Sequence, residues 1–185
     1  NNIYYERLAE ILFPDVVMTV QDMEEKYPPR NLPEDAKVTR FAPSPTGFVH
    51  FGGLFPTRVS ERLAHQSGGV FLLRIEDTDS KREVEGAEEN LINTLESYGI
   101  VFDEGAAAGG GDNGVYGPYR QSLRKPIYHV FAKDLVKRGF AYPCFCTEDE
   151  LSAIRAEQEA EKADPGYYGK WAVWRDAPIE KIEER

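Results

Sequence analysis

The order of apolar and polar residues along the chain predicts short strands that alternate with longer helices. Continuous apolar runs over residues 38–42 and 70–75 have the length and composition of buried parallel strands. Between them, residues 53–66 repeat apolar side chains at helical spacing and predict one helix. Its expected inward-facing residues are Leu54, Phe55, Val59 and Leu63. A strand, a helix and a second strand in this order form a βαβ unit, whose crossover is expected to be right-handed.

The same argument predicts further elements on both sides of this unit. Amphipathic helices are expected over residues 3–13, 84–98 and 126–138. Thr147 and Glu150 have the spacing of a capping box, which predicts that another helix begins there. Residues 100–102 and 170–174 are expected to be short strands, and the glycine-rich residues 105–114 a mobile surface loop.

Composition and charge limit the kinds of partner. The chain has 185 residues, of which 41% are hydrophobic, an ordinary balance for a soluble globular protein. A net charge of −10 argues against a general nucleic-acid-binding surface, because the neutralisation of phosphates takes Lys and Arg. A local basic face is still compatible with this charge, since six basic residues cluster in sequence. They are Arg120, Arg124, Lys125, Lys133, Lys137 and Arg138.

The location of the protein follows from what the chain lacks. No stretch approaches the ~18 consecutive apolar residues of a membrane-spanning helix, so no membrane partner is expected. Cys144 and Cys146 are its two cysteines, too few for a secreted disulfide framework, and a cytoplasmic location is therefore expected. A monomer is the default expectation.

The junction between the first predicted strand and the next helix favours phosphate binding. It turns through two prolines and a glycine and places His50, Gly52 and Gly53 at the predicted start of the helix. Free backbone N–H groups and the positive end of the helix dipole meet at such a place. His50 adds a hydrogen-bond donor for a phosphate oxygen. Spacing alone leaves a Pro/Gly turn with an incidental histidine as an equally good interpretation.

Arg40 and Glu76 lie at the ends of the two neighbouring predicted strands. At the carboxyl end of a parallel sheet they would face the ligand crevice. A guanidinium suits a carboxylate and a carboxylate suits an ammonium group, so the pair is able to hold both poles of an amino acid. An ion pair between Arg40 and the acidic residues after Ile75 is an equal alternative. Asp77 and Asp79 are candidates to cap the following helix, a role expected above all of Asp79, or, less favoured, to bind a metal.

Several ordered motifs resemble those of bacterial glutamyl-tRNA synthetases, which are class I aminoacyl-tRNA synthetases. Residues 50–53 stand where this family has its HIGH-type ATP motif. The other matching segments are residues 40–47, 74–79, 117–122 and 139–142. The resemblance covers about residues 38–174. It implies an α/β fold with the first half of a Rossmann-like parallel sheet and the start of an inserted α+β domain that binds the tRNA acceptor stem.

The resemblance also implies domain boundaries. Residues 1–36 would be an N-terminal helical extension with a proline-rich linker. Residues 37–115 would be the first half of the catalytic domain, and residues 116–185 the incomplete inserted domain. The family's KMSKS-type loop and anticodon-binding domain are expected further along a longer protein, so this piece alone is predicted not to charge tRNA.

Residue roles follow from the same resemblance. L-glutamate would be contacted by Arg40, Ala42, Ser44 and Glu76, with Glu76 at its ammonium group. ATP with Mg²⁺ would be contacted by His50, Gly52 and Gly53, with His50 as the catalytic residue. The products would be glutamyl-adenylate and then glutamyl-tRNA(Glu). The implied tRNA contacts in the basic cluster are Arg120 and Arg124.

Zinc is not expected, although some members of the family bind it in the inserted domain. Cys144 and Cys146 match the first half of the family's ligand pattern, and Tyr167 matches one further ligand. The last position is Trp171, which cannot bind a metal, and structural zinc needs four donors. No resident metal is therefore predicted.

Four rival functions agree less well with the sequence. A glutaminyl enzyme would have a different turn and a different acidic segment after the second strand. A glutamyl-Q tRNA(Asp) synthetase-like paralogue, which glutamylates a modified tRNA base, agrees less well with the long N-terminal extension. A HIGH-type nucleotidyltransferase would explain His50 and the glycines but not Arg40 with Glu76. A non-catalytic tRNA- or protein-binding module would be expected to lose these ligand residues.

Overall fold

The computed structural model describes residues 2–45, 51–79, 84 and 86–185. The chain forms two compact units, each with its own hydrophobic core. The larger unit comprises Gln21–Tyr128, and the smaller unit comprises Asn1–Val20 together with His129–Arg185. No helix in the described residues combines the length and the apolarity needed to cross a membrane.

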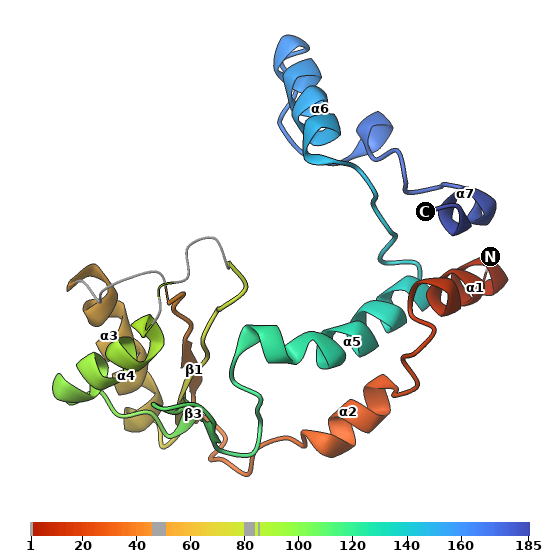
Figure 1. Ribbon diagram of the computed structural model, residues 1–185. Coiled ribbons are helices and arrows are strands. Elements are labelled where there is room, and N and C mark those ends of the chain that lie inside the picture. Colours follow the sequence, from red (N-terminus) through yellow and green to blue (C-terminus); the bar gives the residue numbers. More distant parts are fainter. Residues whose placement is uncertain (1, 46–50, 80–83, 85) are drawn as a thin grey trace. The chain divides into compact units, whose positions relative to one another are not determined.

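A four-stranded sheet lies at the centre of the larger unit, with its strands in the order β1-β2-β3-β4 (Figure 1). The strands are β1 (Val38–Phe41), β2 (Val70–Leu73), β3 (Glu104–Ala106) and β4 (Asp112–Asn113). β1 and β2 are parallel, as are β2 and β3, whereas β4 is antiparallel to β3. The predicted α/β class with a parallel sheet is confirmed.

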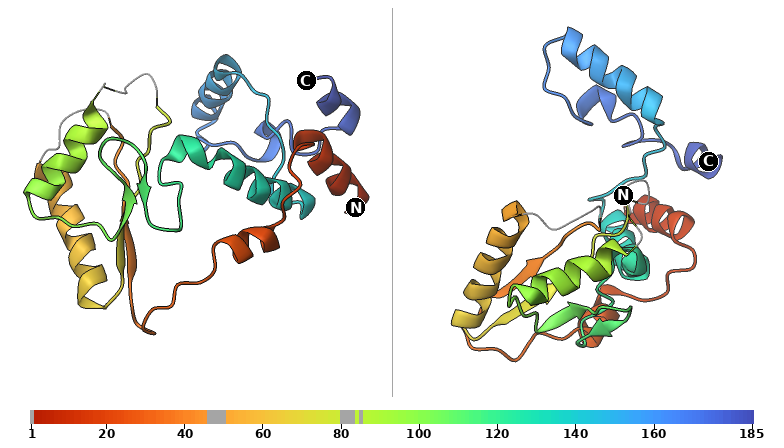
Figure 2. Two further views of the ribbon diagram at one scale, coloured as in Figure 1. Left: turned by 60° about the horizontal axis from the view of Figure 1, so that its bottom comes forward. Right: turned by 60° about the vertical axis from the view of Figure 1, so that its left-hand side comes forward.

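Helices α3 (Phe51–Gln66) and α4 (Ala87–Ser97) connect β1 to β2 and β2 to β3. Both crossovers step along the sheet in the same direction, and right-handed crossovers of this kind place both helices on one face. Figures 1 and 2 show the two helices side by side on that face. The core beneath them is formed by Phe71 and Leu73 of β2 with Leu91 and Leu95 of α4.

Helix α3 turns a different face to the sheet than the sequence predicts. Three of the expected inward residues are exposed, namely Phe55 (68%), Val59 (42%) and Leu63 (54%). Thr57 and Glu61 are buried instead. The Thr57 hydroxyl donates to the Gly53 carbonyl oxygen at 2.6 Å, and the Glu61 carboxylate accepts from the Val101 N–H at 2.9 Å. These polar side chains are buried at little cost because each has its hydrogen-bond partner.

The third strand also differs from its prediction. Residues 100–102 are not a strand. β3 and β4 form a hairpin over residues 104–113, all but the first of which were expected to be a loop. Gly105 explains the error. Its φ is 142°, and a Cβ there would come within 2.5 Å of the Leu73 carbonyl oxygen. This glycine permits the close approach of β2 and β3 and does not mark a loop.

The smaller unit is helical in its described residues. It contains α1 (Asn2–Leu12), most of α5 (Lys125–Lys137), α6 (Glu148–Ala160) and α7 (Ile179–Glu183). A further helix, α2 (Val20–Lys26), lies almost entirely in the larger unit. The helices predicted over residues 3–13 and 126–138 are confirmed, and α6 begins with the predicted capping box of Thr147 and Glu150.

The strand predicted over residues 170–174 is wrong. The chain there forms a 3₁₀ helix, Gly169–Trp171, followed by turns. The Arg175 N–H donates to the Ala172 carbonyl oxygen at 3.1 Å, which continues the bonding between residues three apart. With three residues per turn, Trp171 and Trp174 come to the same side, and both are buried. Alternation in the sequence therefore reflected a turn and not a strand.

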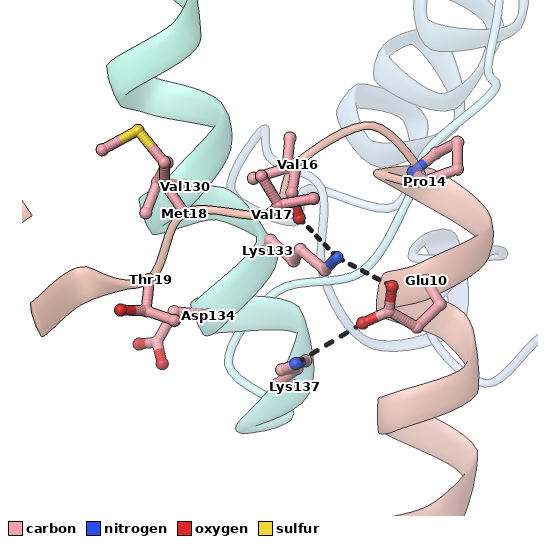
Figure 3. Close-up of a pocket in the computed structure, with 10 residues that line it drawn as sticks. All are labelled: Glu10, Pro14, Val16, Val17, Met18, Thr19, Val130, Lys133, Asp134 and Lys137. Carbon is pink, nitrogen blue, oxygen red and sulfur yellow. Dashed lines mark hydrogen bonds and ion pairs between the residues drawn. The ribbon is translucent and has the colours of Figure 1, made fainter. Parts of the chain in front are cut away.

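One lysine holds the turn that follows α1 (Figure 3). The Lys133 ammonium donates to the Glu10 carboxylate at 2.8 Å and to the carbonyl oxygens of Phe13 at 3.1 Å and Val16 at 2.8 Å. Its side chain is only 10% exposed. A cavity of 370 Å³ opens beside it, lined in part by Val17. All three donors of the ammonium are used, so Lys133 is a structural group of the smaller unit.

Candidate active site

The carboxyl ends of β1 and β2 are held together by backbone hydrogen bonds. Within the sheet, Phe41 lies opposite Leu73. The ladder continues past both strands, because the Arg74 N–H donates to the Phe41 carbonyl oxygen at 3.0 Å and the Glu76 N–H donates to the Pro43 carbonyl oxygen at 2.9 Å. The two segments that carry the predicted glutamate-binding residues therefore leave the sheet side by side.

The predicted residues on the first of these segments differ in burial. Arg40 and Ser44 are exposed, whereas Ala42 is half-buried. Within the described residues, the Arg40 guanidinium makes no hydrogen bond or ion pair. The alternative of an internal ion pair between Arg40 and the acidic residues after Ile75 is not seen there, so this guanidinium is available to an anionic ligand.

Glu76 has a different cationic partner from the one that the sequence suggested. Arg74 donates to its Oε1 atom twice, from Nε at 2.9 Å and from Nη2 at 2.7 Å. Both side chains are mostly buried, with 19% and 26% exposed. The sequence contained a signal for this pair, since residues two apart in an extended segment point to the same side. The pair orients the Glu76 carboxylate at the strand end.

A third segment joins this edge of the sheet. The Ile75 N–H donates to the Tyr119 carbonyl oxygen at 2.9 Å, and the Gln121 N–H donates to the Ile75 carbonyl oxygen at 2.8 Å. Two residues further on, the Asp77 carboxylate accepts from the Ser122 N–H at 2.8 Å and from its hydroxyl at 2.5 Å. Asp77 thus anchors another segment, which corrects its expected role as a helix cap.

The predicted ATP residues lie at the start of α3. Gly52 and Gly53 are in its first turn, and Gly52 is exposed. A Cβ on Gly53 would meet no described atom within 4 Å, so packing among these residues does not require a glycine there. The first-turn N–H groups of α3 are donors suited to a phosphate. His50, with residues 46–49, lies outside the described residues.

Comparison with known proteins identifies this arrangement. Residues 37–182 match the family model for tRNA synthetases class I (E and Q), catalytic domain. The chain belongs to this family. The strand ends that carry Arg40 and Glu76 are therefore part of a class I synthetase catalytic domain.

Individual synthetases of this family are similar over nearly the whole chain. The glutamate–tRNA ligase of Clostridium perfringens (strain 13 / Type A) is 54% identical over 98% of this chain and 33% of its own length. That of Acetivibrio thermocellus is 55% identical over 97% of this chain and 33% of its own length. This chain thus spans a third of the length of these curated relatives.

Solved synthetase structures agree with the fold. The glutamate tRNA ligase from Elizabethkingia meningosepticum, solved in complex with its amino acid, has a TM-score of 0.68 and 41% identity. It matches 82% of this chain and 30% of its own. The synthetase from Elizabethkingia anophelis gives a TM-score of 0.67 at 40% identity, over 80% of this chain and 30% of its own.

The two arginines predicted to contact tRNA form hydrogen bonds and ion pairs within the larger unit. Arg120 forms ion pairs with Glu88 and Asp112, and its hydrogen bond with Glu88 raises the pKa of the guanidinium. Arg124 donates to the Pro118 carbonyl oxygen at 2.7 Å and to the Tyr128 hydroxyl at 3.0 Å. A tRNA contact by either arginine stays a prediction, and these geometries favour a structural role.

Cys146 contacts the tyrosine that matches a further position of the family's zinc pattern. The Cys146 Sγ lies 3.5 Å from the Tyr167 hydroxyl. Burial opposes ionisation of the Cys144 thiol, but hydrogen bonds with Tyr167 and Cys146 lower its pKa overall. No group of three or more His, Cys, Asp or Glu side chains in the described residues is placed to hold a metal ion. Two thiols and a phenol fall short of the four donors of structural zinc.

Proposed function

We propose that the protein containing this chain is a glutamate–tRNA ligase. The joined ends of β1 and β2 carry this proposal, because they bring an available cation, Arg40, and an oriented carboxylate, Glu76, to the same edge of the sheet. L-glutamate carries carboxylates and an ammonium group, which these two side chains complement. The glutamate–tRNA ligases that are 54% and 55% identical to the chain support the choice of amino acid.

The pocket residues divide between the two substrates. Arg40, Ala42 and Ser44 would contact L-glutamate along the segment after β1, and Glu76 would accept from its ammonium group. Its Oε1 atom is held by Arg74, so the other carboxylate oxygen is the one that faces the substrate in this proposal. ATP would lie at the first turn of α3, against Gly52 and Gly53, with His50 as the proposed donor to its phosphates.

The proposed reaction has two steps, in which pyrophosphate and then AMP are the leaving groups. A glutamate carboxylate oxygen attacks the α-phosphorus of ATP, the bond from that phosphorus to the bridging β-phosphate oxygen breaks, and pyrophosphate leaves. Glutamyl-adenylate remains. A hydroxyl of the terminal tRNA ribose then attacks the activated carbonyl carbon, the bond from that carbon to the phosphate oxygen breaks, and AMP leaves while the hydroxyl proton passes to its phosphate or to water. Stabilisation of phosphate charge by positioned donors is the contribution expected of this site.

The partners and location follow from this activity. tRNA(Glu) would be the acceptor, and residues 116–185 would begin the inserted domain that binds its acceptor stem. Residues 1–36 would be an extension that precedes the first half of the catalytic domain at 37–115. A cytoplasmic monomer is the proposed form.

The proposal is tested with the full-length protein in the presence of total tRNA. We expect ATP–pyrophosphate exchange with L-glutamate and formation of glutamyl-tRNA(Glu), but neither with L-glutamine. The Glu76→Gln variant should raise KM for glutamate and leave KM for ATP nearly unchanged, because it removes a charge from the amino-acid pocket alone. The 185-residue chain by itself should not charge tRNA. Preferential charging with glutamine, or glutamylation of tRNA(Asp) alone, would contradict the proposal.

A further inference from the structure

The proline-rich part of the N-terminal extension lies against the segment that follows the β3–β4 hairpin. The Tyr27 hydroxyl donates to the Gly117 carbonyl oxygen at 2.9 Å, and the Tyr116 hydroxyl donates to the Pro28 carbonyl oxygen at 2.8 Å. The Arg30 guanidinium lies 3.8 Å from the centroid of the Tyr116 ring. Contacts in both directions therefore fix residues 27–30 on this part of the larger unit.

Arg30 completes a buried polar cluster at this point. Both of its terminal nitrogens donate to the Glu104 carboxylate, with Nη2 to Oε2 at 2.8 Å. The two side chains are only 16% and 14% exposed. Glu104 Oε2 also accepts from the Tyr119 hydroxyl at 2.8 Å, and Tyr119 is 2% exposed. We call Arg30, Glu104 and Tyr119 the extension clasp.

One backbone hydrogen bond connects the extension clasp to the candidate active site. The Tyr119 carbonyl oxygen accepts from the Ile75 N–H at 2.9 Å, and Ile75 directly precedes Glu76. Tyr119 has few ways to move, because its hydroxyl is held by Glu104 and accepts from the Tyr116 N–H at 3.1 Å. The position of the main chain at Ile75 therefore depends on a side chain that the extension holds in place.

Loss of Arg30 would change this geometry for an electrostatic reason. The Glu104 carboxylate would remain mostly buried without its opposite charge, and such a group moves toward water or becomes protonated. Either response weakens its fixed contact with the Tyr119 hydroxyl. Burial and the bond with Glu104 raise the pKa of Tyr119 to about 12, so the phenol stays a neutral donor throughout the working pH range.

We propose that Arg30 is a positioning residue for the amino-acid pocket and acts on Glu76 through Glu104, Tyr119 and Ile75. The N-terminal extension is then part of the frame of the glutamate site. This inference rests on the proposed function for its kinetic consequence, but its structural consequence at Ile75 can be measured independently of activity.

The test compares variants of the full-length protein. Arg30→Met removes the charge, and Arg30→Lys keeps it but loses the paired donors. Arg7→Met is the matched control, because Arg7 also lies in the extension and forms an ion pair at 3.0 Å, yet its side chain is 57% exposed. We expect Arg30→Met to raise KM for glutamate by about tenfold, which is less than the roughly hundredfold loss that a misplacement of 1 Å can cause.

The remaining kinetic outcomes separate positioning from general destabilisation. KM for ATP should stay within about twofold, Arg30→Lys should recover part of the loss, and Arg7→Met should match the wild type. An unchanged KM for glutamate in Arg30→Met would overturn the inference. Equal losses for glutamate and ATP, without recovery in Arg30→Lys, would also overturn it.

Backbone hydrogen exchange gives a readout that does not need activity. Arg30→Met should speed exchange of the Ile75 amide, while Arg7→Met should not. If the wild type activates no glutamate, the proposed function fails. Amide exchange then still shows whether the extension clasp positions the backbone at Ile75. If exchange at Ile75 is equal in all three proteins, the clasp does not position the strand end.

Discussion

The two units fix their main chains by different means. In the larger unit, hydrogen bonds between backbone groups join β1, β2 and β3. They continue beyond the strand ends, for example at Glu76 and Ile75. In the smaller unit, side chains take over at several turns, where Lys133, Tyr4 and Gln158 bind backbone carbonyl oxygens. The sheet of the larger unit is therefore sensitive to how closely its strands approach, and the turns of the smaller unit are sensitive to the loss of single side chains.

The largest effect is expected where two strands meet without room for a side chain. Gly105→Ala places a Cβ within 2.5 Å of the Leu73 carbonyl oxygen at a φ of 142°. We expect a loss of about 4 kcal/mol or more, the range of exceptional single mutations. Urea unfolding followed by far-ultraviolet circular dichroism measures it. A loss below about 1 kcal/mol would show that the β2–β3 pairing tolerates separation.

The next effect belongs to the smaller unit. Lys133→Met leaves the Phe13 and Val16 carbonyl oxygens without their donor, which should cost about 3 kcal/mol. Both tryptophans of the chain, Trp171 and Trp174, lie in this unit, so their fluorescence follows its unfolding. The exposed Lys170→Met serves as the control, and an equal effect of the two variants would contradict the role given to Lys133.

A smaller effect is expected at the start of α6. Thr147→Ala removes the side-chain acceptor of the Glu150 N–H and should cost about 1 kcal/mol. Thr147→Ser keeps that acceptor and should cost less. The same fluorescence measurement applies, and equal losses in the two variants would exclude the cap as the cause.

The smallest effect is a pH dependence that arises in the smaller unit. A hydrogen bond from Lys133, with a further one from Lys137, lowers the pKa of the exposed Glu10 carboxylate below its ordinary value of 4.5. Its contribution to stability is therefore present above pH 4.5 and is lost as the pH falls through the lower folded-state pKa. Glu10→Gln should flatten the acid limb of the stability curve slightly, because solvent screens this pair. An unchanged acid limb would contradict this contribution.

The difference between strands held by backbone hydrogen bonds and turns held by side chains explains which elements could be predicted from the sequence. The continuous apolar runs at residues 38–42 and 70–75 predicted β1 and β2, because buried parallel strands have such runs. The neighbouring positions of the two strand ends followed from the parallel pairing. Turns that are held by side chains have no characteristic spacing of apolar residues in the sequence. The strand predicted over residues 170–174 was therefore wrong. The inward face of α3 was wrong because buried Thr57 and Glu61 carry their own hydrogen-bond partners.

Only those parts of the candidate site that lie in local sequence motifs could be predicted from the sequence. Arg40 and Glu76 stand at strand ends that a βαβ unit brings together, and the resemblance supplied their roles. The pairing of Arg74 with Glu76 has a local signal in the sequence, because the two residues are two apart in an extended segment. Arg30 and Glu104 had none, since 74 positions separate them and only the folded chain brings them into contact.

The core of the smaller unit crosses the boundary of the matched family model. That model starts at residue 37, yet Leu8 and Ala9 of α1 are completely buried among Val136, Trp174 and Ile182. A protein trimmed to the model's limits would lose α1 and leave those side chains facing water. Aggregation would then mask the fold of the trimmed chain, so any shortened version needs to keep residues 1–20.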